Sequence, residues 1–379
     1  MAHSLTLRAE NFRVLQRLDW SPSGVCLLSG ANGGGKSTAL DALIFLRVLF
    51  DKGHEAAFQR IGARYFRTTG TSESEPVLFE LEVGDVVWKL RFPMATAGIK
   101  DTFGEEVYCA GQLKLRATMF KQEWSLGDEQ LKLDEVRCCA KVAWDRGNAT
   151  WMEPLVAVLS GIHVYKSYWL NQVQKTQPIE LRQHFLHGSG ANLWSVLAGW
   201  KGSAIRSEGR FDWVMAEARK AFPDLLSTLE LEDGFPLLFP PGASDPELGL
   251  PPERAADGLL TGLLHLTALA GARPGSVVAF DEVENQLHPH AIRALMDSMR
   301  RRSEEQDLTV IVTTHSPVVM NEFRGEPEQV FVLDRSDPAR PLPVRMTDLH
   351  DEEWLAQAKL GALYDRLAFA APRKATPQT

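Results

Sequence analysis

A glycine-rich segment near the start of the sequence constrains the fold more than any other feature. Residues Gly30 to Ser37 read GANGGGKS and lie between the apolar run GVCLLSG and the apolar stretch STALDALIFLRVLF. A strand, a loop of pattern G-x-x-x-x-G-K-[ST] and a helix in this order are typical of a phosphate-binding loop. Glycines let backbone N–H groups converge on phosphate oxygens, and the amino terminus of the helix adds partial positive charge.

The loop predicts a set of nucleotide-binding residues. We expect Lys36 to bridge the β- and γ-phosphates of ATP and the Ser37 hydroxyl to ligate Mg²⁺. The alternative is a tight glycine turn that binds nothing. The residues expected to surround the nucleotide are Gly30, Ala31, Asn32, Gly33, Gly34, Gly35, Lys36, Ser37 and Thr38.

Two later segments deliver polar residues at the ends of predicted strands. SVVAFDE places Asp281 and Glu282 after an apolar strand, where a carboxylate is costly unless it serves a metal or a hydrogen-bond network. Asp281 suits Mg²⁺, and Glu282 suits the base that polarises the attacking water. VIVTTHSP places His315 at the same edge of the sheet, within reach of a γ-phosphate. The alternatives are a solvated strand end and a histidine that caps its strand.

The alternation of strands and helices at both ends of the chain predicts an α/β fold with a parallel core sheet, a P-loop NTPase. Between them, period-two alternation as in VLFELEVGDVVWKLRF and EVRCCAKVAW predicts antiparallel strands. We predict residues 1–75 as the N-terminal part of the nucleotide-binding core, 76–150 as an antiparallel β insertion, 151–250 as a helical lobe with a Pro-rich loop, 251–370 as the C-terminal part of the core, and 371–379 as a tail.

Composition excludes several classes of protein. The 379 residues are 44% hydrophobic with a net charge of −8, so the whole molecule is globular and is not a basic nucleic-acid coat. The four cysteines show no C-x-x-C spacing, which favours a reducing cytosol. The first residues lack the pattern of a signal peptide, and the longest apolar run is shorter than the ~20 residues that span a bilayer. We therefore expect a cytoplasmic protein without membrane contact.

The motifs together resemble the ATP-binding-cassette type of ATPase. More narrowly, over residues 5–367, the chain is similar to the RecF/SMC-like and overcoming-lysogenisation-defect (OLD) group of AAA ATPases. The segments that carry this resemblance are ENFRVLQRLDW, LLSGANGGGKSTALDAL, GSGANLWSVL, AFDEVENQLHPHAIRALM and VIVTTHSPVVMNEF. Gln286 stands where that family usually has glycine.

The resemblance implies a homodimer or higher homo-oligomer in which two protomers sandwich ATP. The phosphate loop of each protomer would face a signature helix of the other, here AADGLLTGLLHL, with Gly258 toward the phosphate. Ala256-Asp257-Gly258 replaces the usual Ser-Asp-Gly, and Thr261 stands where a basic residue is frequent. The lost hydroxyl removes a hydrogen bond of about 0.5–1.5 kcal/mol, which predicts slow or partner-dependent hydrolysis. The alternative is a buried helix without a contact in trans.

The implied function is an ATPase switch in DNA maintenance or anti-phage defence. The sequence finishes soon after the last predicted strand, without the acidic cluster of the OLD nuclease domain, so we expect a separate effector, nuclease-like or toxin. DNA or RNA remains an open partner. Two alternatives are a nucleotide-binding scaffold that hydrolyses negligibly because of Ala256, and a transporter subunit, which the missing LSGGQ signature and the long β insertion disfavour.

Some candidates stay open. The family's magnesium-sensing glutamine has four candidates, Gln172, Gln174, Gln177 and Gln183. Arg13 is either near the nucleotide or an ordinary surface residue. MRRRSEE, residues 299–305, is either a phosphate-backbone contact or a solvated helix end. Four histidines lack the partners of a zinc site: His184, His187, His288 and His290.

Overall fold

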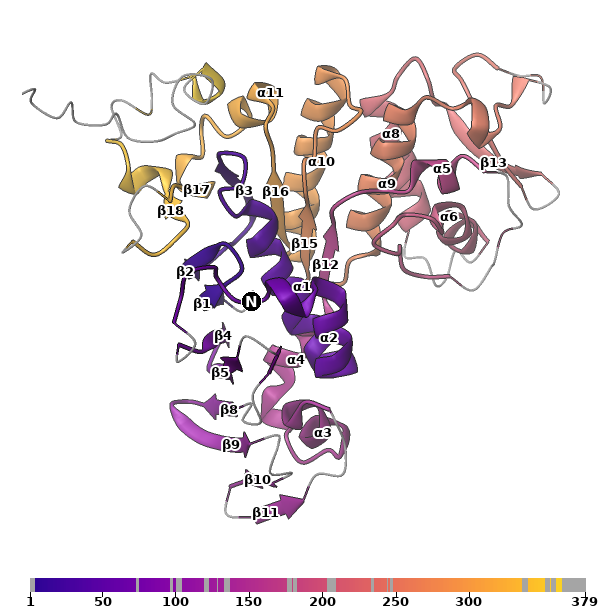
Figure 1. Ribbon diagram of the computed structural model, residues 1–379. Helices are drawn as coiled ribbons and strands as arrows, with labels where there is room; N and C mark the ends of the chain where they lie inside the picture. Colours follow the sequence, from indigo (N-terminus) through magenta and orange to yellow (C-terminus); the bar gives the residue numbers. More distant parts are fainter. Residues whose placement is uncertain are drawn as a thin grey trace, which may run out of the picture.

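Two sheets with helices between and around them make up the computed structural model (Figure 1). It describes residues 4–72, 75–95, 98–99, 104–118, 123–127, 129–132, 137–175, 179, 183–202, 209–232, 235–243, 245, 248–335, 340–351, 355 and 359–362. The α/β class, the parallel core sheet and the antiparallel sheet are confirmed. Among the described residues, no helix combines the length and the apolarity needed to cross a membrane.

The core sheet has six strands, and the first five in its order are parallel. Strand β18 closes one edge antiparallel to β17, and β12 forms the other edge. The order is β12 (Ile162–Tyr165), β15 (Val277–Phe280), β16 (Thr309–Thr313), β3 (Val25–Gly30), β17 (Val330–Leu333) and β18 (Val344–Arg345). The carboxyl ends of β3, β15 and β16 therefore lie side by side.

The second sheet is antiparallel throughout and has eight strands. Its order is β11 (Glu129–Lys132), β10 (Glu123–Leu126), β9 (Gln112–Thr118), β8 (Gly104–Cys109), β5 (Val86–Phe92), β4 (Val77–Val83), β1 (Leu5–Phe12) and β2 (Leu15–Trp20). Strands β1 and β2, from the segment expected to belong to the nucleotide-binding core, thus share one sheet with the expected insertion. Two hairpins stand apart: β6 (Met94–Ala95) with β7 (Gly98–Ile99), and β13 (Thr228–Glu232) with β14 (Phe235–Phe239).

Helices cover the core sheet, and α5, α6, α8 and α9 gather beside its β12 edge (Figure 1). The helices are α1 (Lys36–Lys52), α2 (His54–Ile61), α3 (Cys139–Asp145), α4 (Glu153–Ser160), α5 (Leu170–Val173), α6 (Leu193–Lys201), α8 (Arg210–Ala221), α9 (Asp257–Gly271), α10 (Pro289–Gln306) and α11 (Pro317–Asn321). Short 3₁₀ turns are η1 (Ala63–Tyr65), η3 (Thr150–Met152), η5 (Pro252–Arg254), η6 (Pro327–Gln329) and η7 (Met346–Asp348).

Helix α1 lies between the two sheets. Alternate residues of β3 point to opposite faces of the core sheet, so Cys26 and Leu28 pack in the cluster that holds α1, whereas Leu27 packs in the cluster that holds α9 and α10. On its other side α1 meets the antiparallel sheet, where the ring centroid of Phe45 lies 5.1 Å from that of Phe79. A helix apolar on nearly all sides is expected to lie inside the protein, and this helix does.

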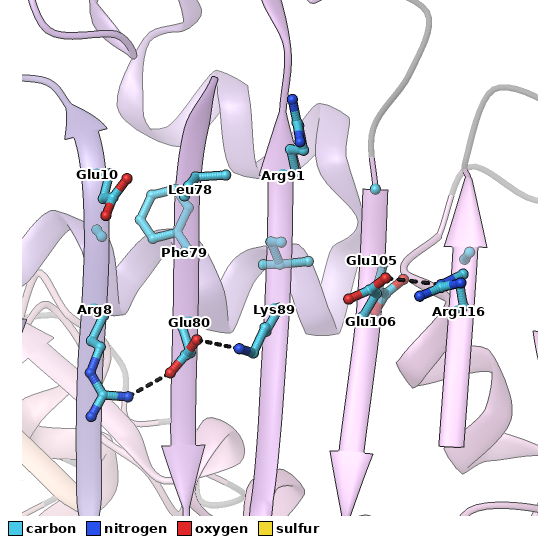
Figure 2. Close-up of a pocket in the computed structure, with 14 residues that line it drawn as sticks. Arg8, Glu10, Leu78, Phe79, Glu80, Lys89, Arg91, Glu105, Glu106 and Arg116 are labelled. Carbon is cyan, nitrogen blue, oxygen red and sulfur yellow. Dashed lines mark hydrogen bonds and ion pairs between the residues drawn. The ribbon is translucent and has the colours of Figure 1, made fainter. Parts of the chain in front are cut away.

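The outer face of the antiparallel sheet carries charges of alternating sign. Residues that pair across five neighbouring strands are Arg8, Glu80, Lys89, Glu106 and Arg116. Lys89 Nζ lies 2.9 Å from a carboxylate oxygen of Glu80, and Arg116 Nε lies 2.9 Å from one of Glu106 (Figure 2). This face forms a hollow of about 480 Å³, and ion pairs join Arg8 to Glu80, Lys89 to Glu80 and Arg116 to Glu106 along it.

Two local predictions are wrong. EVRCCAKVAW does not form a strand over its described part, because Cys139–Asp145 is helix α3. The buried carboxylate of Glu105 accepts hydrogen bonds from the backbone N–H groups of Cys139 and Ala140, which stabilises this helix start. The Pro-rich stretch is not wholly a loop, because Phe235–Phe239 pairs with Thr228–Glu232 as a hairpin.

Candidate functional site

The glycine loop joins β3 to α1 and has the backbone that its glycines permit. Gly33 has φ +73° and Gly35 has φ +111°, both in the left-handed region. A Cβ on Gly35 would lie 2.6 Å from Leu15 Cδ2 on β2, and its φ of +111° would strain any other residue there. Ala31, Asn32 and Gly33 are exposed, whereas Gly34, Gly35 and Thr38 are buried. The loop therefore presents backbone to solvent at its tip and packs tightly at its base.

Lys36 is the first residue of α1 and is 7% exposed. Its ammonium donates to the backbone carbonyls of Gly30 at 2.8 Å and Ala31 at 3.3 Å, so the side chain folds over the loop. Burial lowers the pKa of Lys36, and the nearby carboxylates of Asp281, Glu282 and Glu284 oppose that shift. The ammonium is therefore buried, and its hydrogen bonds go to backbone carbonyls of the loop.

Asp281 joins the loop to two strands of the core sheet. Ser37 Oγ donates to Asp281 Oδ2 at 2.9 Å, and Thr313 Oγ1 donates to Asp281 Oδ1 at 2.6 Å. The backbone N–H of Asp281 also donates to the carbonyl of Tyr165 at 2.9 Å. Four separate segments, α1, β15, β16 and β12, thereby fix one carboxylate beside the first turn of α1.

Glu282 follows with φ +53°, an uncommon conformation for a residue with a side chain. Its backbone N–H donates to Thr313 Oγ1 at 2.8 Å, and Asn285 Nδ2 donates to its Oε2 at 2.9 Å. The side chain is exposed. The turn therefore holds the Glu282 carboxylate at the surface of the sheet edge, where a water molecule can approach it.

His315 reaches the same edge from β16. Its backbone N–H donates to Glu284 Oε1 at 2.7 Å, and its side chain is half-buried. The second oxygen of Glu284 is buried, and no described residue forms a hydrogen bond with it. Glu284 therefore joins the turn that follows β15 to the turn that follows β16. The sequence motifs did not single out this residue.

Lys166 is a second residue that sequence reasoning missed. It follows β12 directly, as Asp281 follows β15, and its Nζ lies 3.0 Å from the carbonyl oxygen of Ser37 and 2.5 Å from Asp41 Oδ1. Arg13 forms an ion pair with the other oxygen of Asp41. Asp41 therefore holds two cations beside the first turns of α1. An apolar strand followed by a charged residue, IHVYK, was the available signal.

A hollow of about 320 Å³ adjoins Asp281 and Glu282. Lys166 and Asn285 line it, together with Tyr168 and His265. Burial lowers the pKa of His265 to about 4, and a backbone hydrogen bond with Thr261 opposes that shift. Among the residues that the structure describes, the buried hydroxyl of Tyr168 has no hydrogen-bond partner. Buried aromatic and ionisable side chains therefore line the space next to the two carboxylates.

The amino terminus of α9 carries the signature-like residues. Ala256 caps the helix with an extended backbone and no side-chain hydrogen bond. A Cβ on Gly258 would lie 2.6 Å from the carbonyl oxygen of Gln286, so glycine allows the β15 turn to approach α9. Gln286 has φ +67°, a conformation that glycine adopts without strain, which gives a physical reason for the family's usual glycine there.

The remaining candidates lie as follows. Gln174 Nε2 donates to Asp257 Oδ1 at 2.6 Å, and Asn192 Nδ2 donates to Gln183 at 3.0 Å. Gln172 is in α5, and Gln177 lies outside the described residues.

The histidine candidates and the basic cluster have other partners. His288 Nδ1 accepts from the N–H of His290 and caps α10. His184 and His187 are exposed. The arginines of MRRRSEE form ion pairs with acidic residues: Arg300 with Glu326, Arg301 with Glu217 and Arg302 with Glu305.

Two stretches of the chain match protein-family models. Residues 9–64, which contain the glycine loop, match the P-loop containing region of AAA domain. Residues 200–321, which contain α9, β15 and β16, match the AAA domain, putative AbiEii toxin, Type IV TA system. These two segments of the chain are therefore similar to AAA domains. No curated protein matches it.

Solved structures of SMC head domains are similar over most of their length. An SMC head bound to the C-winged helix domain of ScpA is 14% identical, with a TM-score of 0.46, over 91% of this chain and 99% of that chain. An SMC head with an extended coiled coil, bound to the C-terminal domain of ScpA derived from Pyrococcus furiosus, is 14% identical, with a TM-score of 0.46, over 92% of this chain and 98% of that chain. The SMC head from Thermotoga maritima is 14% identical, with a TM-score of 0.42, over 91% of this chain and 100% of that chain.

Proposed function

We propose that the chain binds ATP with Mg²⁺ and hydrolyses it slowly as a homodimeric switch. One observation carries this proposal: Asp281 accepts from Ser37 Oγ at 2.9 Å and from Thr313 Oγ1 at 2.6 Å, directly beside the buried ammonium of Lys36. A glycine turn without a ligand gives no reason to bury that ammonium or to bring a carboxylate to the first turn of α1. Both features are costly unless they serve a charged ligand.

The residues present fit a nucleotide and its metal ion. Lys36 would exchange the carbonyls of Gly30 and Ala31 for the β- and γ-phosphates, while the loop N–H groups donate to the same oxygens. Ser37 and Asp281 would supply oxygen atoms of the kind that Mg²⁺ prefers. When bound, the metal ion would neutralise the charge that develops on the phosphate oxygens.

The hydrolytic step is assigned to Glu282 and His315. The Glu282 carboxylate, oriented by Asn285, would accept a proton from the attacking water. His315 would donate to the γ-phosphate and so respond to its presence. Lys166 lies close enough to Ser37 to add positive charge beside the phosphates once it leaves Asp41.

The dimer would form through ATP, with Gly258 and the amino terminus of α9 of one protomer facing the phosphate held by the other. Closing and opening of two protomers would drive a separate effector, nuclease-like or toxin, in defence or DNA maintenance. The family model matched by residues 200–321, which is named for a putative AbiEii toxin and a type IV system, supports the defence setting.

Single-turnover hydrolysis tests the proposal. Replacing Glu282→Gln should keep ATP binding and reduce the rate at least 100-fold, because loss of a general base costs typically 10²–10⁴-fold. Glu55→Gln, an exposed carboxyl on α2, serves as the matched control and should leave the rate unchanged. Lys36→Ala should abolish ATP binding measured by calorimetry. Equal rates for wild type and Glu282→Gln would refute the assignment of the base.

A nucleotide-binding scaffold with negligible hydrolysis is the second candidate. The observation in its favour is Ala256, which caps α9 without a side-chain hydrogen bond where a serine hydroxyl would face the partner's phosphate. In that case wild type and Glu282→Gln would both bind ATP, and neither would turn it over.

A further inference from the structure

A second polar pocket lies at the outer edge of the core sheet, away from the glycine loop. It has a volume of about 340 Å³ and is formed by β12, the end of α4, residues 185–188 and the segment after α9. The carbonyls of Gly161 and Tyr165 accept from the neighbouring strand, whereas that of Ile162 accepts from Arg47. The pocket therefore opens on the unpaired side of the edge strand.

The pocket is separate from the proposed ATP site. Arg47 lines it and lies on α1 eleven residues after Lys36, which corresponds to about 16 Å along the helix axis. His163 lines it from the amino-terminal half of β12, whereas Lys166 follows the carboxyl end of that strand. Tyr165 contributes to both hollows and separates them.

Positive charge in this pocket has no acidic counterpart among its described lining residues. Arg47 lies 3.8 Å from Asp51, a long and partly exposed ion pair one helical turn away. Arg273 is exposed, and its guanidinium carbon lies 5.2 Å from the ring centroid of Phe185. Burial lowers the pKa of His163 to about 4, and both arginines add to that shift, so the two guanidiniums act on one imidazole.

Charge and shape together indicate a ligand class. Guanidinium groups match phosphate oxygens with paired hydrogen bonds, and they also stack on planar rings. Phe185 is 40% exposed at the mouth, where an aromatic ring next to arginine can stack a base. A volume of about 340 Å³ lies at the small end of the ligand-pocket range of roughly 300–1,000 Å³.

We propose that this pocket binds a nucleotide unit, with its phosphate between Arg47 and Arg273 and its base against Phe185. The unit is either a free nucleotide or one residue of a single strand. The site does not depend on hydrolysis at the glycine loop. Loss of ATP turnover in Glu282→Gln would leave nucleotide binding by this pocket intact. A pocket that fails to bind a nucleotide can therefore be distinguished from a failure of the proposed ATPase activity.

Binding of a labelled single-stranded oligonucleotide, followed by fluorescence anisotropy on the full chain, tests the proposal. Arg273→Glu should weaken binding at least tenfold. Arg345→Glu is the matched control, because Arg345 is also exposed and lies 5.5 Å over an aromatic ring, Phe331, but on β18 at the opposite edge of the sheet. It should change binding less than twofold, and ATP turnover should stay at the wild-type level in both variants.

Salt dependence and competition complete the test. Arg273→Gln should make the slope of log K against log salt shallower by about 0.7, the value for one phosphate of a single strand. Competition by AMP, measured with Lys36→Ala to exclude the loop, would identify a free nucleotide as ligand; binding of the strand alone would identify the strand. His187 is also exposed in this pocket, so His187→Gln provides a second variant of its lining. Thermal unfolding checks that each variant is folded. Equal effects of Arg273→Glu and Arg345→Glu, or no binding of either probe, would overturn the proposal.

Discussion

At the scale of single residues, Thr313 has a position that its small size conceals. Its hydroxyl donates to Asp281 Oδ1 at 2.6 Å and accepts from the N–H of Glu282 at 2.8 Å, so one oxygen holds the carboxylate of Asp281 and the backbone of Glu282. A threonine at the end of a strand draws little attention in a sequence. The function of Thr313 is therefore to position Asp281 and Glu282.

Replacing Thr313→Val should slow single-turnover hydrolysis about tenfold while ATP binding changes little. Valine keeps the shape of threonine but removes a hydrogen bond to a charged group, worth about 1.5–3 kcal/mol, and a loss of 1.4 kcal/mol corresponds to a factor of ten. Thr309→Val, at the other end of β16, is the control and should leave the rate unaltered. A normal rate in Thr313→Val would show that Asp281 and Glu282 hold their positions without it.

At the scale of secondary-structure elements, the attachment of α3 to the antiparallel sheet depends on Glu105. This side chain is fully buried on β8, and its carboxylate accepts from Trp88 Nε1 at 2.9 Å and from the N–H of Cys139 at 2.7 Å. Cys138 Sγ also lies 2.8 Å from it, and burial, followed by that carboxylate, raises the pKa of the thiol. The carboxylate satisfies donors from both the sheet and the helix.

Glu105→Gln should lower the free energy of unfolding by about 2–3 kcal/mol, because the amide replaces a charged acceptor and brings two donors that meet no acceptor. The next residue supplies the control: Glu106 points to the solvated face, where its ion pair with Arg116 is worth about 0–1 kcal/mol. Urea denaturation of both variants measures the difference. Similar losses for Glu105→Gln and Glu106→Gln would contradict the buried role of Glu105.

The secondary-structure elements also show which parts of the fold and of the site could be predicted from the sequence. The glycine loop, β15 with Asp281 and β16 with His315 were predictable because strand, motif and helix are neighbours in the chain. Thr313 and Glu284 were not, because their partners follow other strands and only the packed sheet brings them together. The strand IHVY followed by a lysine marks Lys166 in the sequence, but its partners Ser37 and Asp41 lie on α1, and only the folded chain brings them together. Helix α3 was missed because alternating apolar residues imitate a strand, whereas a buried carboxylate from β8 favours the helix.

At the scale of the whole molecule, the exposed position of Glu282, Asn285 and Gln286 is consistent with a surface that a second protomer would cover. In sedimentation velocity, ATP with Mg²⁺ should therefore convert Glu282→Gln, which retains ATP, from monomer to dimer. Adding Ala256→Ser should tighten that dimer about 2- to 12-fold per site, the equivalent of one hydrogen bond of about 0.5–1.5 kcal/mol.

Lys36→Ala supplies the reference for that experiment, since without ATP binding it should sediment identically with and without nucleotide. If ATP leaves the sedimentation of Glu282→Gln unchanged, the sandwich dimer is wrong, whatever the rate of hydrolysis. If Ala256→Ser has no effect, the amino terminus of α9 does not contact the partner's phosphate.

Helix α1 begins at the glycine loop and is packed on one side against the core sheet and on the other against the antiparallel sheet. Interiors packed at this density compress little, so a shift of the first turn has to be shared by both layers. The charged outer face around Arg8 and Arg116 would then be displaced when the loop is filled (Figure 2). A downstream protein could sense the nucleotide state on that distant surface without touching the nucleotide.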